Sequence, residues 1–383
     1  MKLPLIPLLY VLIGFPLVAL DQTFLEAVAP VSPVLKAQGG VSTANAEGFD
    51  ALFANPAAFT AVRPSITLLD LETTAHVSFS ALKSILETRD SWGKDLLDKD
   101  SRLLSTLNDL IPLMPLGGEA SARMGWVGNN LGVGLAVQGR VSAKGLNNLL
   151  DSTVTMDQTT MGVIGMGWPL DVGLGTLNIG GALRPMQKAF GTAPFTLVKD
   201  ETTNMSAYDV LSGFGLAWDL GLRWDYSGFK TGLTVKDIGS TKLSLKKYTG
   251  KQWVDALSLP SGGSSVSTLY LVPMTIGLGS TWSPDLGSLA AIVQPSLSFD
   301  LQIPIKDENN QPSFWTMTHL GTEVQFLRLL SVRAGLNQGY VTFGLGAKLF
   351  IVDFNLAIYS DELSRYSGVN RRPAMSFSWA LRL

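Results

Sequence analysis

From residue 65 to the end, the chain alternates between apolar and polar positions with a period of two. The pattern is clearest at 212–224, where Phe214, Leu216 and Trp218 alternate with Gly215 and Asp219. Such alternation indicates a β-strand with one apolar face. About 14 segments follow it, many near the roughly 9–11 residues that a tilted strand needs to cross a membrane. They are 65–79, 119–127, 131–141, 159–168, 176–185, 212–224, 229–238, 272–282, 291–303, 314–325, 330–336, 341–349, 352–359 and 372–383.

The connections between these segments alternate between short and long over most of the chain. Gly128-Asn129-Asn130 and Tyr226-Ser227-Gly228 are tight turns, whereas 142–158, 186–211 and 239–271 are long. Transmembrane barrels of the outer membrane have short periplasmic turns and longer external loops. We therefore expect both termini on the periplasmic side.

The long connection after the first segment has a helical pattern. Apolar residues recur at spacings of three and four, or multiples of them, over 81–114, as at Leu82, Ile85, Leu86, Leu103 and Leu107. We predict a helical insertion there. It packs on its own loop as a lid, or it offers an external site where an amphiphile first adsorbs.

Composition supports a membrane protein without spanning helices. Only 16% of residues are charged and mean hydropathy is +0.24. Lys2 followed by the apolar run 3–20 predicts a signal peptide over 1–20, cleaved between 19 and 29; an uncleaved anchor is the alternative. No later apolar run is long enough for a transmembrane helix, and a closed barrel is the other structure that satisfies its backbone in lipid. Cysteine is absent, which excludes disulfides.

The two faces of the strands predict which side meets lipid. The apolar face is large and aromatic, and the other carries glycine, serine and single charges. A soluble lipocalin-like barrel has about eight strands and an apolar interior. About 14 strands with these faces predict an all-β transmembrane antiparallel β-barrel, apolar outside and polar inside. Five tryptophans fall near predicted strand ends and suit interfacial girdles: Trp126, Trp218, Trp224, Trp282 and Trp379.

Residues 48–62 fit neither a strand of the barrel wall nor a solvated linker; their sequence is GFDALFANPAAFTAV. It is too apolar for a solvated linker, and Gly48 and Pro56 suit neither a long helix nor a strand. We predict that residues 21–63 form an N-terminal hatch, or plug, inside a barrel of residues 64–383. Within it, Pro56 fixes its own φ and biases Asn55 to an extended conformation, and Asn55 can bond nearby backbone. Asn55-Pro56-Ala57 is the expected hinge of the plug.

The chain resembles the outer-membrane long-chain fatty acid transporters, the FadL-like family. The likeness rests on Asn55-Pro56-Ala57 in an apolar setting after the export segment, followed by the long alternating chain. It implies a fourteen-stranded barrel whose N-terminal hatch fills the lumen. The stretch 320–363 also resembles a wider group that includes PorV-type secretion shuttles. The chain departs from the family in its helical insertion and in ending on Leu383, where many barrels end on an aromatic residue.

Two sets of residues are candidates for ligand contact. The apolar hatch residues have no core to join except inside the barrel, where they line a narrow apolar pocket or form an inert cork. They are Phe49, Leu52, Phe53, Phe59 and Val62. Four inward-facing arginines either meet a ligand carboxylate or pair with the other inward charges or with the hatch. They are Arg123, Arg140, Arg223 and Arg333.

The sequence gives little evidence for a catalytic site. His319 and Glu323 share a strand face, but four residues separate them by roughly 13 Å, too far for a hydrogen bond. A relay from His319 to Asp300 or Ser298 on the neighbouring strand is the one conceivable arrangement. No hydrolase elbow, phosphate-binding loop or metal cluster occurs in the sequence. We therefore expect no enzyme activity, cofactor or metal.

The sequence predicts passive transport of hydrophobic molecules, foremost long-chain fatty acids, across a bacterial outer membrane. The expected partners are outer-membrane lipid and the ligand. A net charge of −2 argues against nucleic acid, and a monomer is expected. The alternatives are a docking or structural barrel for exported proteins and a general porin. Polar, partner-sized loops such as 239–270 favour docking, whereas a continuous apolar channel through 49–62 favours transport.

Overall fold

The computed structural model describes residues 29–60, 64–77, 116–145, 152–194, 209–255, 261–306 and 311–383. The predicted signal peptide, the predicted helical insertion at 81–114 and Val62 lie outside these ranges. Among the residues that are described, no helix has the length and hydropathy needed to cross a membrane.

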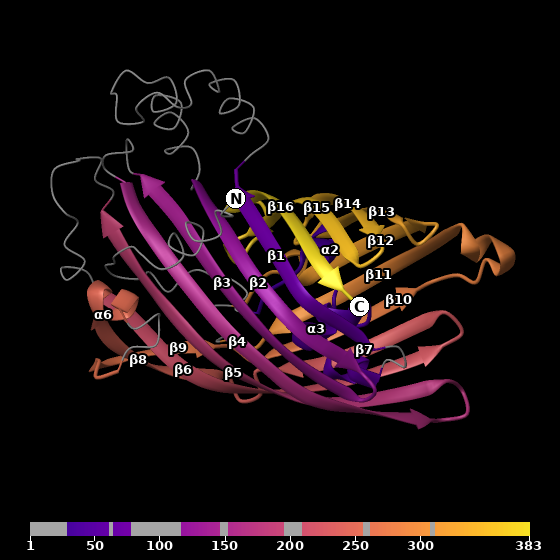
Figure 1. Cartoon of the computed structure of the whole chain (residues 1–383), viewed down its shortest axis with the longest axis horizontal. Helices are drawn as coiled ribbons and strands as arrows, with labels where there is room; N and C mark the ends of the chain where they lie inside the picture. Colours follow the sequence, from indigo (N-terminus) through magenta and orange to yellow (C-terminus); the bar gives the residue numbers. More distant parts are fainter. Residues whose placement is uncertain are drawn as a thin grey trace, which may run out of the picture.

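The wall is a closed antiparallel barrel of 14 strands (Figure 1). Each strand pairs with the next, and β1 pairs with β16 to close the ring. The strands are β1 (Ser65–His76), β2 (Leu116–Gly128), β3 (Leu131–Gly145), β4 (Ser152–Asp171), β5 (Thr176–Pro194), β6 (Asp209–Tyr226), β7 (Phe229–Lys236), β10 (Thr275–Trp282), β11 (Val293–Pro304), β12 (Thr318–Phe326), β13 (Leu330–Asn337), β14 (Tyr340–Leu349), β15 (Val352–Glu362) and β16 (Arg371–Arg382). The predicted fold class is confirmed.

Strand boundaries differ from the prediction in a few places. β4 and β5 are much longer than the patterned cores at 159–168 and 176–185, because the alternation weakens toward their ends while the pairing continues. Residues 314–317 were predicted as strand but form the short helix α7 (Phe314–Met317). Trp218 lies near the middle of β6 and not near its end, because β6 begins at Asp209.

The prediction that residues 239–271 form a long loop is wrong. It contains β8 (Thr241–Thr249), α6 (Gly250–Asp255) and β9 (Ser264–Val272). β7 pairs with one end of β6, from Tyr226 to Leu220, and β8 pairs with the other, from Phe214 to Asp209. Strand β6 is longer than β7, and β8 pairs with the part of β6 that extends beyond β7.

A buried ionic cluster marks the point where β8 replaces β7 beside β6. Arg184 of β5 is 1% exposed. Its Nη2 donates to Asp219 at 3.0 Å and to Asp237 at 2.7 Å. The Asp237 amide also donates to Asp219 at 2.9 Å, and Asp237 has a φ of 53°. The turn out of β7 is therefore held to the wall by charge and by backbone bonding.

The outward face is apolar over most of the wall. On β6, Phe214, Trp218 and Leu220 are exposed, whereas Ala217 and Asp219 between them are buried. At the end of the barrel where the short turns lie, several exposed aromatic residues form a band: Trp126, Trp168, Trp224, Tyr226, Phe229 and Trp282. An apolar belt with an aromatic girdle is the surface that a barrel presents to lipid.

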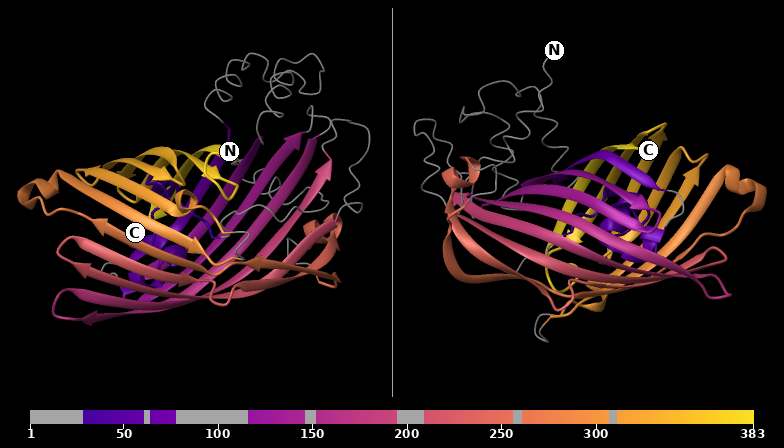
Figure 2. Two further views of the ribbon diagram at one scale, coloured as in Figure 1. Left: turned by 180° about the vertical axis from the view of Figure 1, so that it is seen from behind. Right: turned by 60° about the horizontal axis from the view of Figure 1, so that its bottom comes forward.

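A plug of residues 29–60 crosses the lumen and packs against the inner wall (Figure 2). It contains α2 (Pro33–Ala37), η1 (Gly48–Asp50), α3 (Ala51–Ala54) and η2 (Pro56–Thr60). α2 lies against β13–β16, while η2 lies against β2–β6. Outside the plug, the short helix η6 (Gly287–Ala291) joins β10 to β11.

Inward-facing glycines let the plug backbone touch the wall. A Cβ at Gly221 would overlap the Asn55 side chain, and one at Gly180 would overlap Pro56. Opposite them, a Cβ at Gly335 would lie 2.5 Å from the Gly39 nitrogen. The glycines that the sequence places on the polar face thus accommodate the plug.

Candidate functional site

The plug motif is built around Asn55. Its φ of −148° and ψ of 110° are extended, as the following proline requires. Its Oδ1 accepts from the Ala57 amide at 3.0 Å, and its Nδ2 donates to the Thr43 carbonyl at 2.7 Å. Nδ2 also reaches the Leu222 carbonyl of β6 at 3.3 Å. The expected conformation and backbone bonding of Asn55 are confirmed, and one side chain ties two plug loops and the wall together.

Asp300 of β11 is the main wall acceptor for the middle of the plug. Its Oδ2 accepts from the amides of Ser42 and Thr43, each at 2.7 Å. The next strand, β12, places His319 directly across from Asp300, and His319 Nδ1 donates to the Gly39 carbonyl at 2.8 Å. The pair predicted as a conceivable catalytic relay therefore binds plug backbone. Ser298 instead bonds Thr281 at 3.0 Å.

The two ends of the plug are bonded to opposite sides of the wall. Beside α2, Thr342 of β14 donates to the Ala37 carbonyl at 2.8 Å and accepts from the Gly39 amide at 3.1 Å. At the other end, Thr60 donates to Asn178 of β5 at 2.7 Å. The plug is thus attached across the full width of the lumen.

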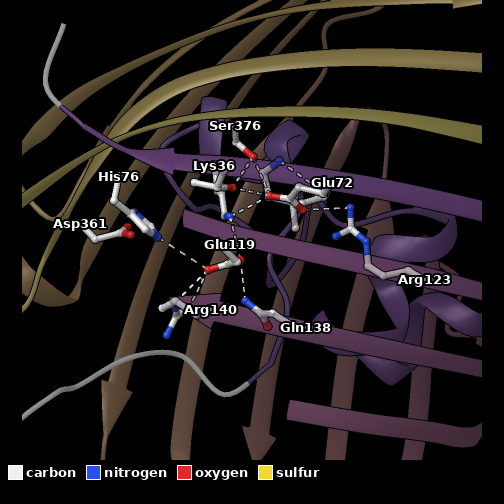
Figure 3. A network of polar contacts seen from close by, with 12 residues as sticks. Lys36, Glu72, His76, Glu119, Arg123, Gln138, Arg140, Asp361 and Ser376 are labelled. Carbon is white, nitrogen blue, oxygen red and sulfur yellow. Dashed lines mark hydrogen bonds and ion pairs between the residues drawn. The ribbon is translucent and has the colours of Figure 1, made fainter. Parts of the chain in front are cut away.

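Lys36 of α2 joins the plug to a network of buried charges on β1, β2 and β3 (Figure 3). Its Nζ lies 2.9 Å from Glu72 and 3.8 Å from Glu119. Arg123 bridges Asp70 and Glu72 at 3.0 and 3.1 Å. The network continues through Arg140 to Glu119, and through Arg382 to Asp70 and Asp353. Four cations (Lys36, Arg123, Arg140 and Arg382) face four carboxylates (Asp70, Glu72, Glu119 and Asp353), and Asp50 of the plug is a further acidic group near Arg123 and Arg382.

Burial and the neighbouring charges shift the pKa values of two plug residues, Lys36 and Asp50. Burial lowers the pKa of Lys36, but Glu72, Tyr359 and Glu119 more than compensate and raise it well above its usual value. Lys36 therefore stays charged in the packed plug. Burial raises the pKa of Asp50, and the attraction of Arg382 and Arg123 offsets only part of that rise. Asp50 accepts a hydrogen bond from Ser32 at 2.9 Å.

Four of the five predicted apolar hatch residues form a single cluster with the wall. Phe49, Leu52, Phe53 and Phe59 are buried, and the rings of Phe49 and Phe53 lie 5.7 Å apart. The wall side of the cluster comes from seven strands, with Met161 and Val163 on β4, Ala182 and Met186 on β5, and one residue on each of β2, β3, β6, β8 and β9: Val127, Ala136, Ala217, Leu243 and Val272. A buried apolar cluster therefore extends from the plug along the long strands to the β8–β9 hairpin.

The four candidate arginines all contact acidic residues of the barrel. Arg123 is described above. The other three form ion pairs at 2.9 Å (Arg140 with Glu119), 2.8 Å (Arg223 with Asp225) and 2.9 Å (Arg333 with Glu323). The structure does not gather them into one site. Their role toward a ligand carboxylate stays a prediction.

Sequence reasoning missed Lys36, and it placed Asp300 only among the inward charges that pair with one another or with the hatch. Lys36 stands in a segment without periodicity, and the bonds of Asp300 join residues more than 250 positions apart in the chain. The sequence signal was the inward placement of Asp300 on a patterned strand. In the described part of the chain, no group of three or more His, Cys, Asp or Glu side chains could hold a metal.

No protein-family model matches the chain, and no curated protein matches it. Solved structures do. A "TodX deltaS2S3 mutant monoaromatic hydrocarbon channel" is similar with a TM-score of 0.50 and 12% identity, over 92% of this chain and 98% of that chain. The P. putida toluene transporter TodX has a TM-score of 0.48 and 12% identity, over 93% and 98% of the two chains. Outer membrane phospholipase A from Escherichia coli has a TM-score of 0.28 and 11% identity, over 84% and 97%.

The first of these likenesses shows a shared fold: a 14-strand outer-membrane barrel with an N-terminal helical segment. It supports the predicted resemblance to a FadL-like barrel at the level of architecture. The link to PorV-type barrels gains no support and stays a prediction.

Proposed function

We propose that this protein is an outer-membrane channel that passes hydrophobic molecules across a plugged lumen. The observation that carries the proposal is the apolar cluster that joins the plug residues Phe49, Phe53 and Phe59 to Met161 and Leu243 of the wall. A water-filled porin has a polar interior and needs no such surface. An apolar ligand needs an apolar lining with a few polar groups to orient it.

The outer surface supports the location in an outer membrane. Its apolar belt and aromatic girdle suit lipid contact, and the short turns and longer connections lie on opposite rims. β1 begins and β16 ends at the short-turn rim, where the Ile66 amide donates to the Leu383 carbonyl at 3.0 Å. We assign that rim, with the start of β1 and the end of β16, to the periplasm; a periplasmic N-terminus stays a prediction.

Long-chain fatty acids are our first choice of ligand. The charged network around Lys36 and Arg140 lies beside the plug and could exchange one of its carboxylate partners for that of a fatty acid. A small aromatic hydrocarbon is the competing ligand class, because the similar solved channels are named for monoaromatic hydrocarbons and toluene. It would use the apolar cluster without the charges.

Transport would be passive and would involve no catalytic residue, cofactor or nucleotide. The ligand enters from the side of the long connections and reaches the apolar cluster, and a shift of the plug about Asn55-Pro56-Ala57 opens the route onward. The monomer is sufficient, because the barrel closes on itself.

Saturable binding of a fluorescent long-chain fatty acid to the purified protein tests this proposal. Unlabelled fatty acid and toluene serve as competitors and separate the two ligand classes. Phe53→Asp places a charge in the apolar cluster and should weaken binding about 10-fold or more, since burying an unpaired charge is costly. Phe53→Leu keeps the site apolar and should bind within about 3-fold of the parent.

Two results would overturn the proposal. A parent protein that binds neither probe would point to the docking barrel for exported proteins. A parent protein that conducts ions freely in planar bilayers, with Phe53→Asp unchanged, would point to a general porin.

A further inference from the structure

The outer face of β8 carries two lysines that the transport route does not use. Side chains on this strand alternate: Leu243 and Leu245 are buried toward the lumen, whereas Lys242, Ser244 and Lys246 are exposed on the outside. The hairpin and α6 lie at the lower left of Figure 1, beside the far ends of β5 and β6. These lysines therefore lie on the surface that faces away from the lumen.

Lys242 lies among apolar side chains. Its cross-strand partner on β9 is Leu271, which is exposed on the same face. The neighbouring position, Ser244, pairs with exposed Leu269 on β9 and with Phe214 on β6, whose side chain is 62% exposed. The apolar outer belt thus extends beside Lys242 and on both sides of Ser244.

Neither lysine has an ion-pair partner among the residues that the structure describes. Lys246 has Ser212 and Ser265 as its cross-strand partners, and no partner of Lys242 or Lys246 on β6 or β9 carries a carboxylate. Two nearby lysines differ in this respect. Lys247 pairs with Asp209 at 2.5 Å, and Lys251 pairs with Asp255 at 3.6 Å.

The height of these lysines on the barrel can be measured along β6. Trp224 belongs to the aromatic girdle at the short-turn rim, and Phe214, the partner of Ser244, lies ten residues further along the same strand. Ten residues at ~3.3 Å each span ~33 Å. A tilt of roughly 40° reduces this to about 25 Å, the height of the apolar band of such barrels. Lys242 and Lys246 therefore bracket the far membrane interface.

We propose that Lys242 and Lys246 bind the head group of a diphosphorylated glycolipid in the outer leaflet, an inference that rests on the proposed membrane location. A lysine in an apolar belt extends its ammonium to the interface, where an anionic head group completes its hydrogen bonds. The two lysines are four residues apart on one face, ~13 Å along the strand. A head group with two phosphates can meet both cations, whereas a phospholipid offers one phosphate.

Titration of the purified full-length protein in neutral detergent with diphosphoryl lipid A, followed by native mass spectrometry, tests the proposal. The parent should bind diphosphoryl lipid A more tightly than monophosphoryl lipid A, and higher salt should weaken both. The double variant Lys242→Gln/Lys246→Gln should bind it about 10- to 30-fold more weakly, as expected for two interfacial lysines. Lys242→Arg/Lys246→Arg should retain binding.

Lys251→Gln is the matched control, because it removes an exposed lysine of the same region that already has a partner. It should bind lipid as the parent does. Equal binding by the parent and the double glutamine variant, or no preference of the parent for the second phosphate, would overturn the proposal. Fatty-acid binding by the double variant should equal that of the parent, so this result is independent of the transport assay.

Discussion

At the scale of single residues, Asn55 shows how far local chemistry can be predicted. The proline that follows it determines its extended backbone, and its side chain bonds the Ala57 amide as an Asx turn would. Its contact with Thr43, twelve residues earlier, could not be read from the sequence, because it depends on how the plug folds back on itself.

Asn55→Ala should loosen the plug without unfolding the barrel. The side chain is 1% exposed, and its loss leaves the Thr43 carbonyl and the Ala57 amide without a partner. Each buried unsatisfied group costs about 1–3 kcal/mol. Hydrogen exchange measured by mass spectrometry should rise in residues 40–60 and stay unchanged in β10–β16. Asn370→Ala, at an exposed loop position, is the control; equal exchange in both variants would contradict the role given to Asn55.

At the scale of elements, period-two alternation predicted every strand of the closed barrel but missed the β8–β9 hairpin. The signal was present, since Leu243 and Leu245 alternate with Lys242 and Ser244. It was hidden because lysines stand where the other strands carry apolar residues. The partner exchange along β6 could not be predicted at all, because Arg184, Asp219 and Asp237 come together only in three dimensions.

Arg184→Ala should destabilise the wall where β7 gives way to β8. It leaves the carboxylates of Asp219 and Asp237 buried without their cation. Breaking a buried ion pair in this way costs about 3–5 kcal/mol. Thermal unfolding, followed by the mobility of folded and unfolded protein on gels, should shift to lower temperature. Arg328→Ala, in the exposed turn between β12 and β13, should not shift it, and a similar midpoint for both variants would contradict the proposed role of the cluster.

At the scale of the whole molecule, the lumen is filled by backbone as well as by side chains. The inward face of the strands was expected to be polar and rich in glycine, and it is. The reason for the glycines was not visible in the sequence. Gly221, Gly180 and Gly335 leave room for plug backbone or side-chain atoms that arrive from residues 39–57. Because plug and wall interlock in this way, occlusion of the lumen depends on the few polar groups that hold the plug in register.

Asp300 is the group whose loss should open the lumen most directly. Its carboxylate accepts the amides of Ser42 and Thr43, and hydrogen bonds to a charged acceptor are worth about 1.5–3 kcal/mol each. Asp300→Ala removes both and leaves two amides unpaired in the middle of the plug. In planar bilayers this variant should show larger or more frequent conductance steps than the parent. Asp285→Ala, in the exposed turn between β10 and β11, should conduct as the parent does. If Asp300→Ala also keeps the parent's conductance, the plug is held by its apolar contacts with the wall, and the apolar cluster alone would control passage.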